Sequence, residues 1–589
     1  MTIAITRSRD RFATDYIEEC ASIIERSNAH SMIEEFWHQD RGTGGRPRSG
    51  TQYSLLAVLV IGLALIGTCR APSMAEIYRR IWDLGEELQQ RLGVELHGTQ
   101  EENSYSGFAM WLTRKMAPLD SFPDIPARRV KNSEHRTALA SRTFEQQEQS
   151  HIASERLHQV VNALVAASIH DVAPDAYRGD IVADETIIDL AGQSQGLGSR
   201  DEKRRGAAYS GAYYIRDRED HSLHREIGSR RVIKGGVGIG VTAISRIGAP
   251  GDVYGVAPVI TAVSIGKPSS GSVEELERAI RYHQQNGLDR RSRRGRLPLL
   301  TVDMGYNVKK SFNDLLLSAG YAPVVRYPTT WRTVVASDAA ISDMRPPGAM
   351  QISGDFYCPA ARAYMGDGKL VQKTQALLEA NDDSFERHDA RIEKLFPLLM
   401  GTNSRPYRRS SRRGRPSKSQ NEENVPVRID LVCPAVQGRV KCPLKPGSFQ
   451  IAPPTAPQIS PSWTADRYKC CAQSSYAHEY SEEQWKRAQW GLVPGSWEHA
   501  THYEAARSVT EQRFSIMKST YVTGMENLKR GVRREPMLGI TIALWIAATN
   551  LAIQESYSRR KTLPNSTEKR MRLIAEDIGR TPVKIPPRT

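Results

Sequence analysis

The sequence predicts an α/β protein in which helices flank a mixed β-sheet, with a helical domain before the sheet and a cysteine-containing insertion within it. Three observations indicate this class. Three extended apolar runs follow one another between residues 180 and 265, and helical and extended segments then alternate up to residue 327. This order is typical of a mixed sheet with helices on its faces. Beyond it, prolines and cysteines interrupt the pattern, and helical periodicity returns only near residue 502.

Length and composition narrow the classes of function. The 589 residues predict about three or four domains. Hydrophobic residues at 39% and charged residues at 25% argue against a collagen-like, coiled-coil or mostly disordered chain. The 81 Lys and Arg exceed the 66 Asp and Glu by 81 − 66 = 15. This basic excess favours polyanionic partners, with nucleic acid before an acidic membrane surface.

Targeting signals are not evident in the sequence. The first residues lack the apolar stretch of a signal peptide, and the most apolar run, Leu55–Ile66, is too short to cross a bilayer. Seven cysteines in so long a chain do not form a disulfide scaffold. We therefore expect a reduced cytoplasmic location and no membrane partner.

Residues 1–120 are predicted to form a helical domain. An apolar helix covers Ser54–Arg70, and a third helix of the region covers Ser104–Met116. Between them a helix restarts at Ser73, with Glu76 three residues later in the spacing of a capping box. Two interpretations stay open: a unit like a helix-turn-helix that binds DNA ends, or a plain helical packing domain.

Residues 121–170 are expected to form a linker and a helix, and residues 171–330 the first part of the sheet domain. Short β-branched runs predict the strands, and helical periodicity predicts the helices. Strands are expected over Asp180–Leu190, Lys234–Ser245, Val253–Ile265, Leu297–Asp303 and Ala322–Tyr327, and helices over Phe144–Ala167, Val273–Gln285 and Val308–Ala319.

Three further segments complete the predicted organisation. Residues 331–500 form an insertion domain with a basic loop at Arg405–Lys418, residues 501–555 the last part of the sheet domain, and residues 556–589 a basic tail. Such a basic loop stays unstructured unless it meets a polyanion, so DNA contact and a solvated loop are both open.

Three acidic residues stand out by their placement. Asp184 lies inside an apolar strand, where a charge is rarely found without a partner. Asp303 ends a buried strand and opens into a turn, a position well suited to a functional site. Glu511 lies on a predicted helix, four residues after Arg507 and seven before Lys518. That spacing places a carboxylate between two cations on one helical face.

This set suits phosphodiester chemistry. Two Mg²⁺ ions held by carboxylates can activate an attacking oxygen and stabilise a leaving oxygen. Cations beside them would hold the DNA backbone and offset its charge. The alternative interpretation is an ion pair without a function in catalysis: an Arg–Glu pair at this spacing is common on exposed helices and contributes only a few tenths of a kcal/mol to stability.

The arrangement resembles the DDE transposases of bacterial insertion sequences. Their third motif is Y-x2-R-x3-E-x6-K, and Arg507, Glu511 and Lys518 match its R-E-K portion. VADET around Asp184 and VDMGYN around Asp303 resemble the first two motifs. The resemblance covers about residues 178–330 and 500–555, and the long interval between the last two acids is similar to members with an inserted domain.

The resemblance implies an RNase H-like catalytic core that cleaves DNA at the ends of a mobile element and joins them to a target. It implies two Mg²⁺ or Mn²⁺ ions held by Asp184, Asp303 and Glu511. Its implied partners are transposon-end DNA and target DNA, bound by a homodimer. The residues expected to contact DNA are Arg507, Lys518, Tyr503, Arg293 and Arg294, the last two from a basic cluster before the strand of Asp303.

The sequence also departs from the motif. The position of its tyrosine is occupied by Glu504, and Tyr503 lies one residue early. Glu504 is therefore a rival to Glu511, although only Glu511 has Arg and Lys at the expected distances. Two other functions stay open: an RNase H-like nuclease that cleaves without joining, and an inert DNA-binding protein derived from a transposase.

Five cysteines fall within the predicted insertion. Four of them, Cys358, Cys433, Cys442 and Cys470, are candidates for a structural zinc site, because four thiolates can hold Zn²⁺. However, the sequence has no CxxC pair, and the adjacent Cys470 and Cys471 rarely fit one tetrahedral site. Reduced cysteines scattered through a small subdomain are the alternative interpretation.

Overall fold

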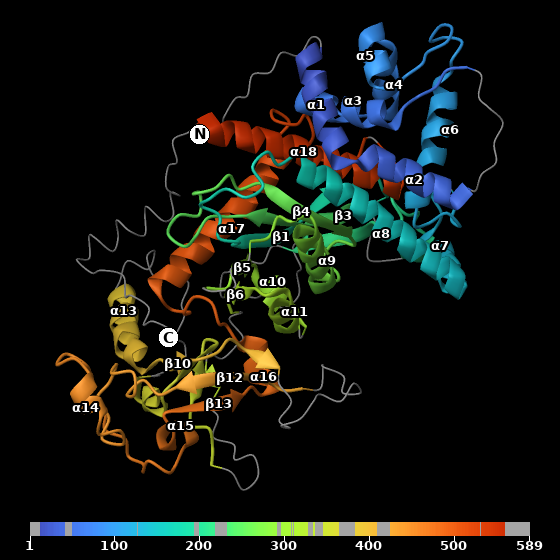
Figure 1. The fold of residues 1–589 in the computed structure, drawn as a ribbon. Helices are drawn as coiled ribbons and strands as arrows, with labels where there is room; N and C mark the ends of the chain where they lie inside the picture. Colours follow the sequence, from blue (N-terminus) through green and yellow to red (C-terminus); the bar gives the residue numbers. More distant parts are fainter. Residues whose placement is uncertain are drawn as a thin grey trace.

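The computed structural model describes residues 12–41, 50–126, 128–193, 200–217, 232–290, 296–307, 309, 311–327, 334–335, 345–364, 383–408, 425–530 and 532–559. A helical region lies at one end, a sheet with its helices in the middle, and a smaller subdomain at the other end (Figure 1). Arg293, Arg294, most of the basic loop and most of the basic tail lie outside the described residues.

The N-terminal region is helical, as the sequence predicts. Ser54, Ser73 and Ser104 each begin a helix, and each side chain accepts a hydrogen bond from the backbone N–H three residues later. The helices are α1 (Thr14–Ser27), α2 (Ala29–Arg41), α3 (Leu55–Gly67), α4 (Met74–Trp82), α5 (Glu86–Arg91) and α6 (Tyr105–Met116). Almost every residue of α3 is buried, because helices from both ends of the chain surround it.

The stretch 121–143, expected as a linker, is more ordered than a linker. It contains α7 (Asn132–Ala140), and Ile125 and Val130 are buried against Tyr209. The next helix, α8 (Phe144–Ala167), has the predicted bounds and begins with a capping box at Thr143.

The last described helix, α18 (Glu535–Arg559), lies in the centre of the protein. It packs against α3 and α8 and lies over the sheet, so it joins the helical region to the sheet in one hydrophobic core (Figure 1). Among the described residues it is the one helix long and apolar enough to span a bilayer, and that apolar window is completely buried inside the protein.

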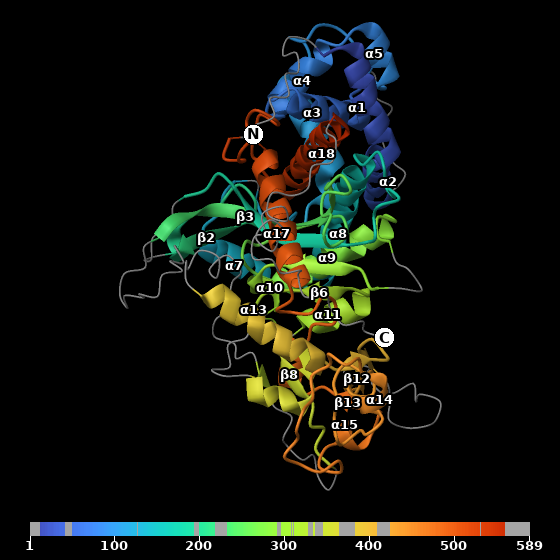
Figure 2. The ribbon, with the colours of Figure 1, turned by 90° about the vertical axis from the view of Figure 1, so that its left-hand side faces the viewer.

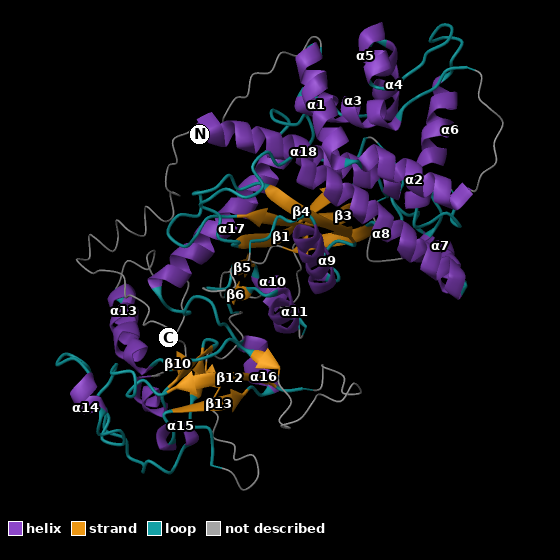
Figure 3. Ribbon diagram, viewed as in Figure 1, coloured by secondary structure: helices purple, strands orange, loops and turns teal. Residues whose placement is uncertain are grey.

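The central sheet is mixed. Its strands are β1 (Ile181–Asp189), β2 (Ala212–Asp217), β3 (Val232–Arg246), β4 (Ile260–Gly266), β5 (Leu299–Val302) and β6 (Ala322–Val324). β1 pairs antiparallel with β3 and parallel with β5, and β5 pairs parallel with β6. β2 and β4 pair with different halves of β3. Figure 3 shows the strands together in the middle layer, between helices.

Two of these strands differ from the prediction. β2 was not expected, and the strand predicted over Val253–Ile265 begins only at Ile260, because the preceding residues form turns and loops. The helix predicted over Val308–Ala319 begins only at Phe312, as α11 (Phe312–Ala319), and a separate short helix, α10 (Met304–Asn307), occupies the stretch expected as a turn after Asp303.

The outer edge of β4 is closed by two asparagines. Asn162 of α8 accepts from the Val263 N–H at 2.8 Å and donates to the Val263 carbonyl at 2.9 Å. Asn550 of α18 does the same for Ile260, at 2.9 and 2.8 Å. Both amides are fully buried, so they satisfy backbone groups that a neighbouring strand would otherwise pair.

Helices cover both faces of the sheet. Ile181 and Ala183 of β1 join the core formed with α9 (Ser272–Gln285) and α11. Val182, on the opposite face, packs against Ala505 and Val509 of α17 (Trp497–Met517). Figure 2 shows α17 running beside the sheet from the helical region toward the smaller subdomain.

The smaller subdomain is built from short strands and many turns. One sheet contains β10 (Gly401–Thr402), β11 (Tyr407–Arg408), β12 (Val427–Val432) and β13 (Ser475–Glu479), and another β7 (Val334–Val335), β8 (Met350–Ile352) and β9 (Asp355–Tyr357). Its short helices are α13 (Ser384–Leu395), α14 (Ser448–Ile451), α15 (Lys469–Ala472) and α16 (Glu482–Arg487). All this chain lies between β6 and α17, where the insertion is predicted.

Candidate functional site

The structure brings Asp184 and Asp303 to adjacent positions on neighbouring strands. The last parallel pair between β1 and β5 joins Ala183 to Val302. The next residue on each strand is one of the two aspartates, so the pair lies where β5 ends and β1 continues. These two residues are 303 − 184 = 119 positions apart in the sequence. Parallel pairing alone places them together.

Both aspartates are half-buried. Burial raises the pKa of Asp184 to about 7, and the charge of Asp303 adds to that rise. A hydrogen bond from the Glu185 N–H to the Asp184 Oδ1, at 2.7 Å, acts in the opposite direction. The buried Asp303 Oδ1 has no hydrogen-bond partner within the described residues. An unsatisfied carboxylate oxygen beside a second carboxylate is chemically suited to a cation.

Side-chain alternation directs Asp184 toward α17. Successive residues of a strand point to opposite faces, so Asp184 and Thr186 share the face on which Val182 packs against α17. The Lys518 Nζ, at the end of α17, donates to the Thr186 Oγ1 at 2.6 Å and to the Ile187 carbonyl at 2.8 Å. Lys518 therefore fixes the end of the helix to β1.

Arg507 connects the aspartate pair to Glu511. Partial burial of the Arg507 side chain acts to lower its pKa. The nearby acidic side chains, above all Asp303, outweigh this effect, so the pKa of Arg507 lies above its ordinary value. The Arg507 Nε lies 3.5 Å from the Glu511 Oε1. The Glu511 side chain is 64% exposed and turned to this arginine. Across the described ranges, no three side chains of His, Cys, Asp or Glu stand close enough together to share one metal ion.

Arg326 is a residue that the sequence analysis missed. It follows β6, the third parallel strand, and lies near Asp303. Its guanidinium is 4.8 Å from the centre of the Tyr503 ring and forms an ion pair with Glu504. The signal was available: a cation two residues after a parallel strand lies at the same sheet edge as the aspartates.

These contacts bear on the two departures from the transposase motif. Glu504 is paired with Arg326, so its carboxylate is engaged away from Glu511. Tyr503 is buried, and burial together with Asp303 raises its pKa to about 12. The structure thus places Tyr503 as a neutral core side chain beneath Arg326. DNA contact by Tyr503 stays a prediction.

The other acids on β1 have structural partners. Asp180 is fully buried and receives two bonds from Arg296, at 2.9 and 2.6 Å. Asp189 accepts from the Tyr214 hydroxyl and pairs with Lys529 at 3.2 Å. Glu185 is also engaged, because it accepts the Ser269 N–H at 2.8 Å. Asp184 is thus set apart by its neighbour Asp303 rather than by any feature of its own strand.

The five cysteines of the insertion gather around one small cavity of the smaller subdomain. Cys358, Cys433, Cys442, Cys470 and Cys471 are all buried and all line it. Sequence spacing gave no indication of this convergence. The predicted zinc set is brought to one place, although as placed the thiols surround a space and do not meet at a point.

No protein-family model, curated protein or solved structure matches this chain.

Proposed function

We propose that this protein is a metal-dependent DNA transposase with an RNase H-like core, which cleaves the ends of a mobile element and joins them to target DNA. The observation that carries the proposal is the Asp184–Asp303 pair on adjacent parallel strands, faced by a helix that supplies Arg507 and Glu511. The joining step and the DNA partners rest on the resemblance of the three motifs.

The strand order supports the proposed core. Antiparallel strands β1, β3 and β4 are followed by the parallel strands β5 and β6, with α9 and α11 after β4 and β5. The helix with the third acid, α17, comes after a long insertion. This is the order expected of an RNase H-like core with an insertion before its last catalytic helix.

The residues at the sheet edge fit a hard divalent cation. Asp184 and Asp303 provide carboxylate oxygens, one of them buried without a hydrogen-bond partner, as Mg²⁺ or Mn²⁺ prefers. When bound, such ions supply Lewis-acid activation of the phosphodiester. Two ions with Glu511 as third ligand remain part of the proposal, and Glu511 must first leave Arg507.

Bound DNA would release Glu511 from Arg507. Acidic side chains surround Arg507, whose side chain is 42% exposed to solvent. A phosphate of the substrate would compete for this cation through charge-assisted bonds. Glu511 would then be free to turn toward the aspartate pair. In this view Arg507 positions DNA and controls when the third carboxylate joins the site.

The decisive experiment measures cleavage and joining in one reaction. Linear duplexes that carry the DNA flanking the gene are labelled at their 3′-ends and incubated with the full chain, a plasmid and Mg²⁺ or Mn²⁺. We expect joined products, reduced by roughly three orders of magnitude in Asp184→Asn, Asp303→Asn and Glu511→Gln. Glu526→Gln, an exposed acid outside the site, is the matched control and should retain activity.

The other outcomes are separate and informative. Hydrolysis without joined product would replace the proposal with an RNase H-like nuclease. DNA binding without any cleavage, unchanged by Asp184→Asn, would indicate an inert transposase-derived protein. Loss of activity in Glu504→Gln but not in Glu511→Gln would assign the third carboxylate to Glu504. A homodimer should appear by light scattering when end DNA is added.

A further inference from the structure

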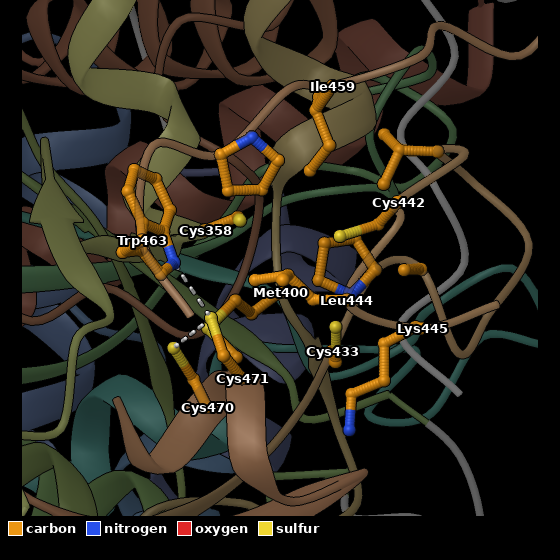
Figure 4. Close-up of a pocket in the computed structure, with 14 residues that line it drawn as sticks. Cys358, Met400, Cys433, Cys442, Leu444, Lys445, Ile459, Trp463, Cys470 and Cys471 are labelled. Carbon is orange, nitrogen blue, oxygen red and sulfur yellow. Dashed lines mark hydrogen bonds between the residues drawn. The ribbon is translucent and has the colours of Figure 1, made fainter. Parts of the chain in front are cut away.

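Four of the five buried sulfurs of the smaller subdomain stand around a common space. In Figure 4 the sulfur atoms of Cys358, Cys433, Cys442 and Cys471 surround it, while that of Cys470 lies beyond Cys471. The cavity has room for about one particle the size of a water molecule. That size suits a single ion better than a cluster of several metal atoms.

Three of these cysteines begin the same kind of turn. Cys358, Cys433 and Cys442 are each followed by proline, and the backbone N–H three residues later donates to each cysteine carbonyl, at 2.9, 3.0 and 3.0 Å respectively. The turns also direct amides at the sulfur. Ala360 donates to the Cys358 sulfur, Ala435 and Val436 to that of Cys433, and Leu444 and Lys445 to that of Cys442.

Amide donors aimed at sulfur favour the thiolate over the thiol. Thiols packed as ordinary apolar side chains have no need of such donors. Each of the three turns directs backbone N–H groups at a cysteine sulfur. This arrangement is explained if the sulfurs carry negative charge in the functional state.

Cys471 is better placed than Cys470 to be the fourth ligand. The Trp463 Nε1 donates to the Cys471 Sγ at 3.4 Å, and Lys445 lies near enough to favour its charge. The sulfur of Cys470 lies 3.9 Å from that of Cys471, and either thiol can be the donor in this contact.

The donor set selects the kind of metal. The cavity is lined by five sulfurs of cysteine, apolar side chains and one charged residue, Lys445, with no Asp, Glu or His among its lining residues. Soft thiolates without oxygen donors favour zinc over magnesium or calcium. Four thiolates around one Zn²⁺ leave two net negative charges, which Lys445 offsets in part.

We propose that Cys358, Cys433, Cys442 and Cys471 bind one structural Zn²⁺ as thiolates, with Cys470 outside the ligand set. In the metal-free arrangement the thiols stand too far apart to share an ion, so binding must turn them inward over the cavity. Zinc–sulfur distances of about 2.3 Å place neighbouring sulfurs about 3.8 Å apart in a tetrahedral site. The ion would join β9, β12 and α15, whose cysteines are far apart in the sequence.

The test measures metal content and ligand identity on the full chain. Protein expressed in medium with zinc and iron, and purified under reducing conditions without a metal-binding tag, is analysed by mass spectrometry of its elements. We expect about one zinc per chain. Cys433→Ser and Cys471→Ser should lose most of it, while Cys470→Ser and the distant Cys69→Ser should keep it.

A second measurement tests the site even if the ligand variants fail to fold. Wild-type protein loaded with Co²⁺ should show the intense visible bands of tetrahedral cobalt with sulfur-to-metal charge transfer, and Cys470→Ser should show the same bands. Zinc at less than about one tenth of an ion per chain, even after incubation with Zn²⁺, would overturn the proposal. Iron with sulfide, a Cys470–Cys471 disulfide, or equal zinc loss in Cys470→Ser and Cys471→Ser would overturn the assignment as well.

Discussion

At the scale of single residues, the candidate site depends on charges that burial makes costly. Asp184 and Asp303 have no lysine or arginine as a direct ion-pair partner among the described residues, whereas Asp180, on the same strand face, is paired with Arg296. Two acids on one face of the chain therefore have different roles. Asp180 holds the strand in place, and Asp184 carries the uncompensated charge that a cation would relieve.

This difference predicts opposite effects of two similar substitutions. The pKa of Asp184 is about 7 in the folded protein against 3.8 in a solvated chain, so the folded state binds more protons between these values. The contribution of Asp184 to the stability of the metal-free protein therefore falls as pH rises from about 4 to about 7. Asp184→Asn removes that cost, and we expect a gain of about 1–2 kcal/mol at pH 8, less than the full shift because Asp184 is partly solvated.

The measurement is denaturant unfolding in EDTA at pH 8 and pH 5. The gain from Asp184→Asn should shrink at pH 5, where the wild-type carboxyl is mostly protonated in the folded state. Asp180→Asn is the matched control and should destabilise the protein at pH 8, because it removes the ion pair of the fully buried Asp180 carboxylate with Arg296. If Asp184→Asn lowered the stability at pH 8, the ionised Asp184 carboxylate would not be destabilising, and the prediction would be wrong.

At the scale of elements, buried amides replace a missing strand. β4 pairs with β3 alone among the described strands, and Asn162 and Asn550 satisfy its other edge from two different helices. These helices therefore fix the sheet edge by hydrogen bonds in addition to apolar packing. The position of β3, and through it β1 and Asp184, depends on them.

The two asparagines give a prediction about stability. Asn162→Ala or Asn550→Ala leaves a buried N–H and a buried carbonyl of β4 without partners, and each should cost about 2–4 kcal/mol. Asn286→Ala, a partly buried amide with a single bond to the Asn162 carbonyl, should cost less than about 1 kcal/mol. The free energy of unfolding of each variant is measured by urea unfolding, monitored by circular dichroism. Equal effects at all three positions would contradict a special role for the edge.

At the scale of the whole molecule, the helical region and the sheet share one hydrophobic core. Residues of α1, α3, α8 and α18 belong to it together with residues of β1, β3 and β4. Residues 1–120 are predicted to form a domain of their own, but α18, which covers α3, comes from the other end of the chain. Removing it would expose the apolar surface of α3 to water.

We therefore predict that a fragment of residues 1–120 does not fold stably alone. It should show low helicity or aggregate, and unfold without a cooperative urea transition, whereas the full chain unfolds cooperatively. Circular dichroism and analytical ultracentrifugation of both proteins measure this. A soluble monomeric fragment with a cooperative transition would show that the helical region is an independent domain.

Local sequence patterns are enough to predict most of the helices and strands around the candidate site, together with the acidic residues on them. Apolar runs and helical periodicity were sufficient to locate α3, α8, β1, β5 and α17, because hydrophobic periodicity is a local property. They also placed Asp303 at a strand end and Glu511 beside Arg507. Strands with little hydrophobic signal, such as β2, were missed because their pairing with β3 stabilises them.

Only the tertiary structure decided which of these residues meet. The register of β1 with β5 places Asp184 beside Asp303, and packing of β6 against β5 brings Arg326 to the same edge. The cysteine cavity arose in the same way, from turns as much as 113 residues apart, since 471 − 358 = 113. Such contacts depend on strand pairing and core packing over the whole chain, and no local pattern of residues encodes them.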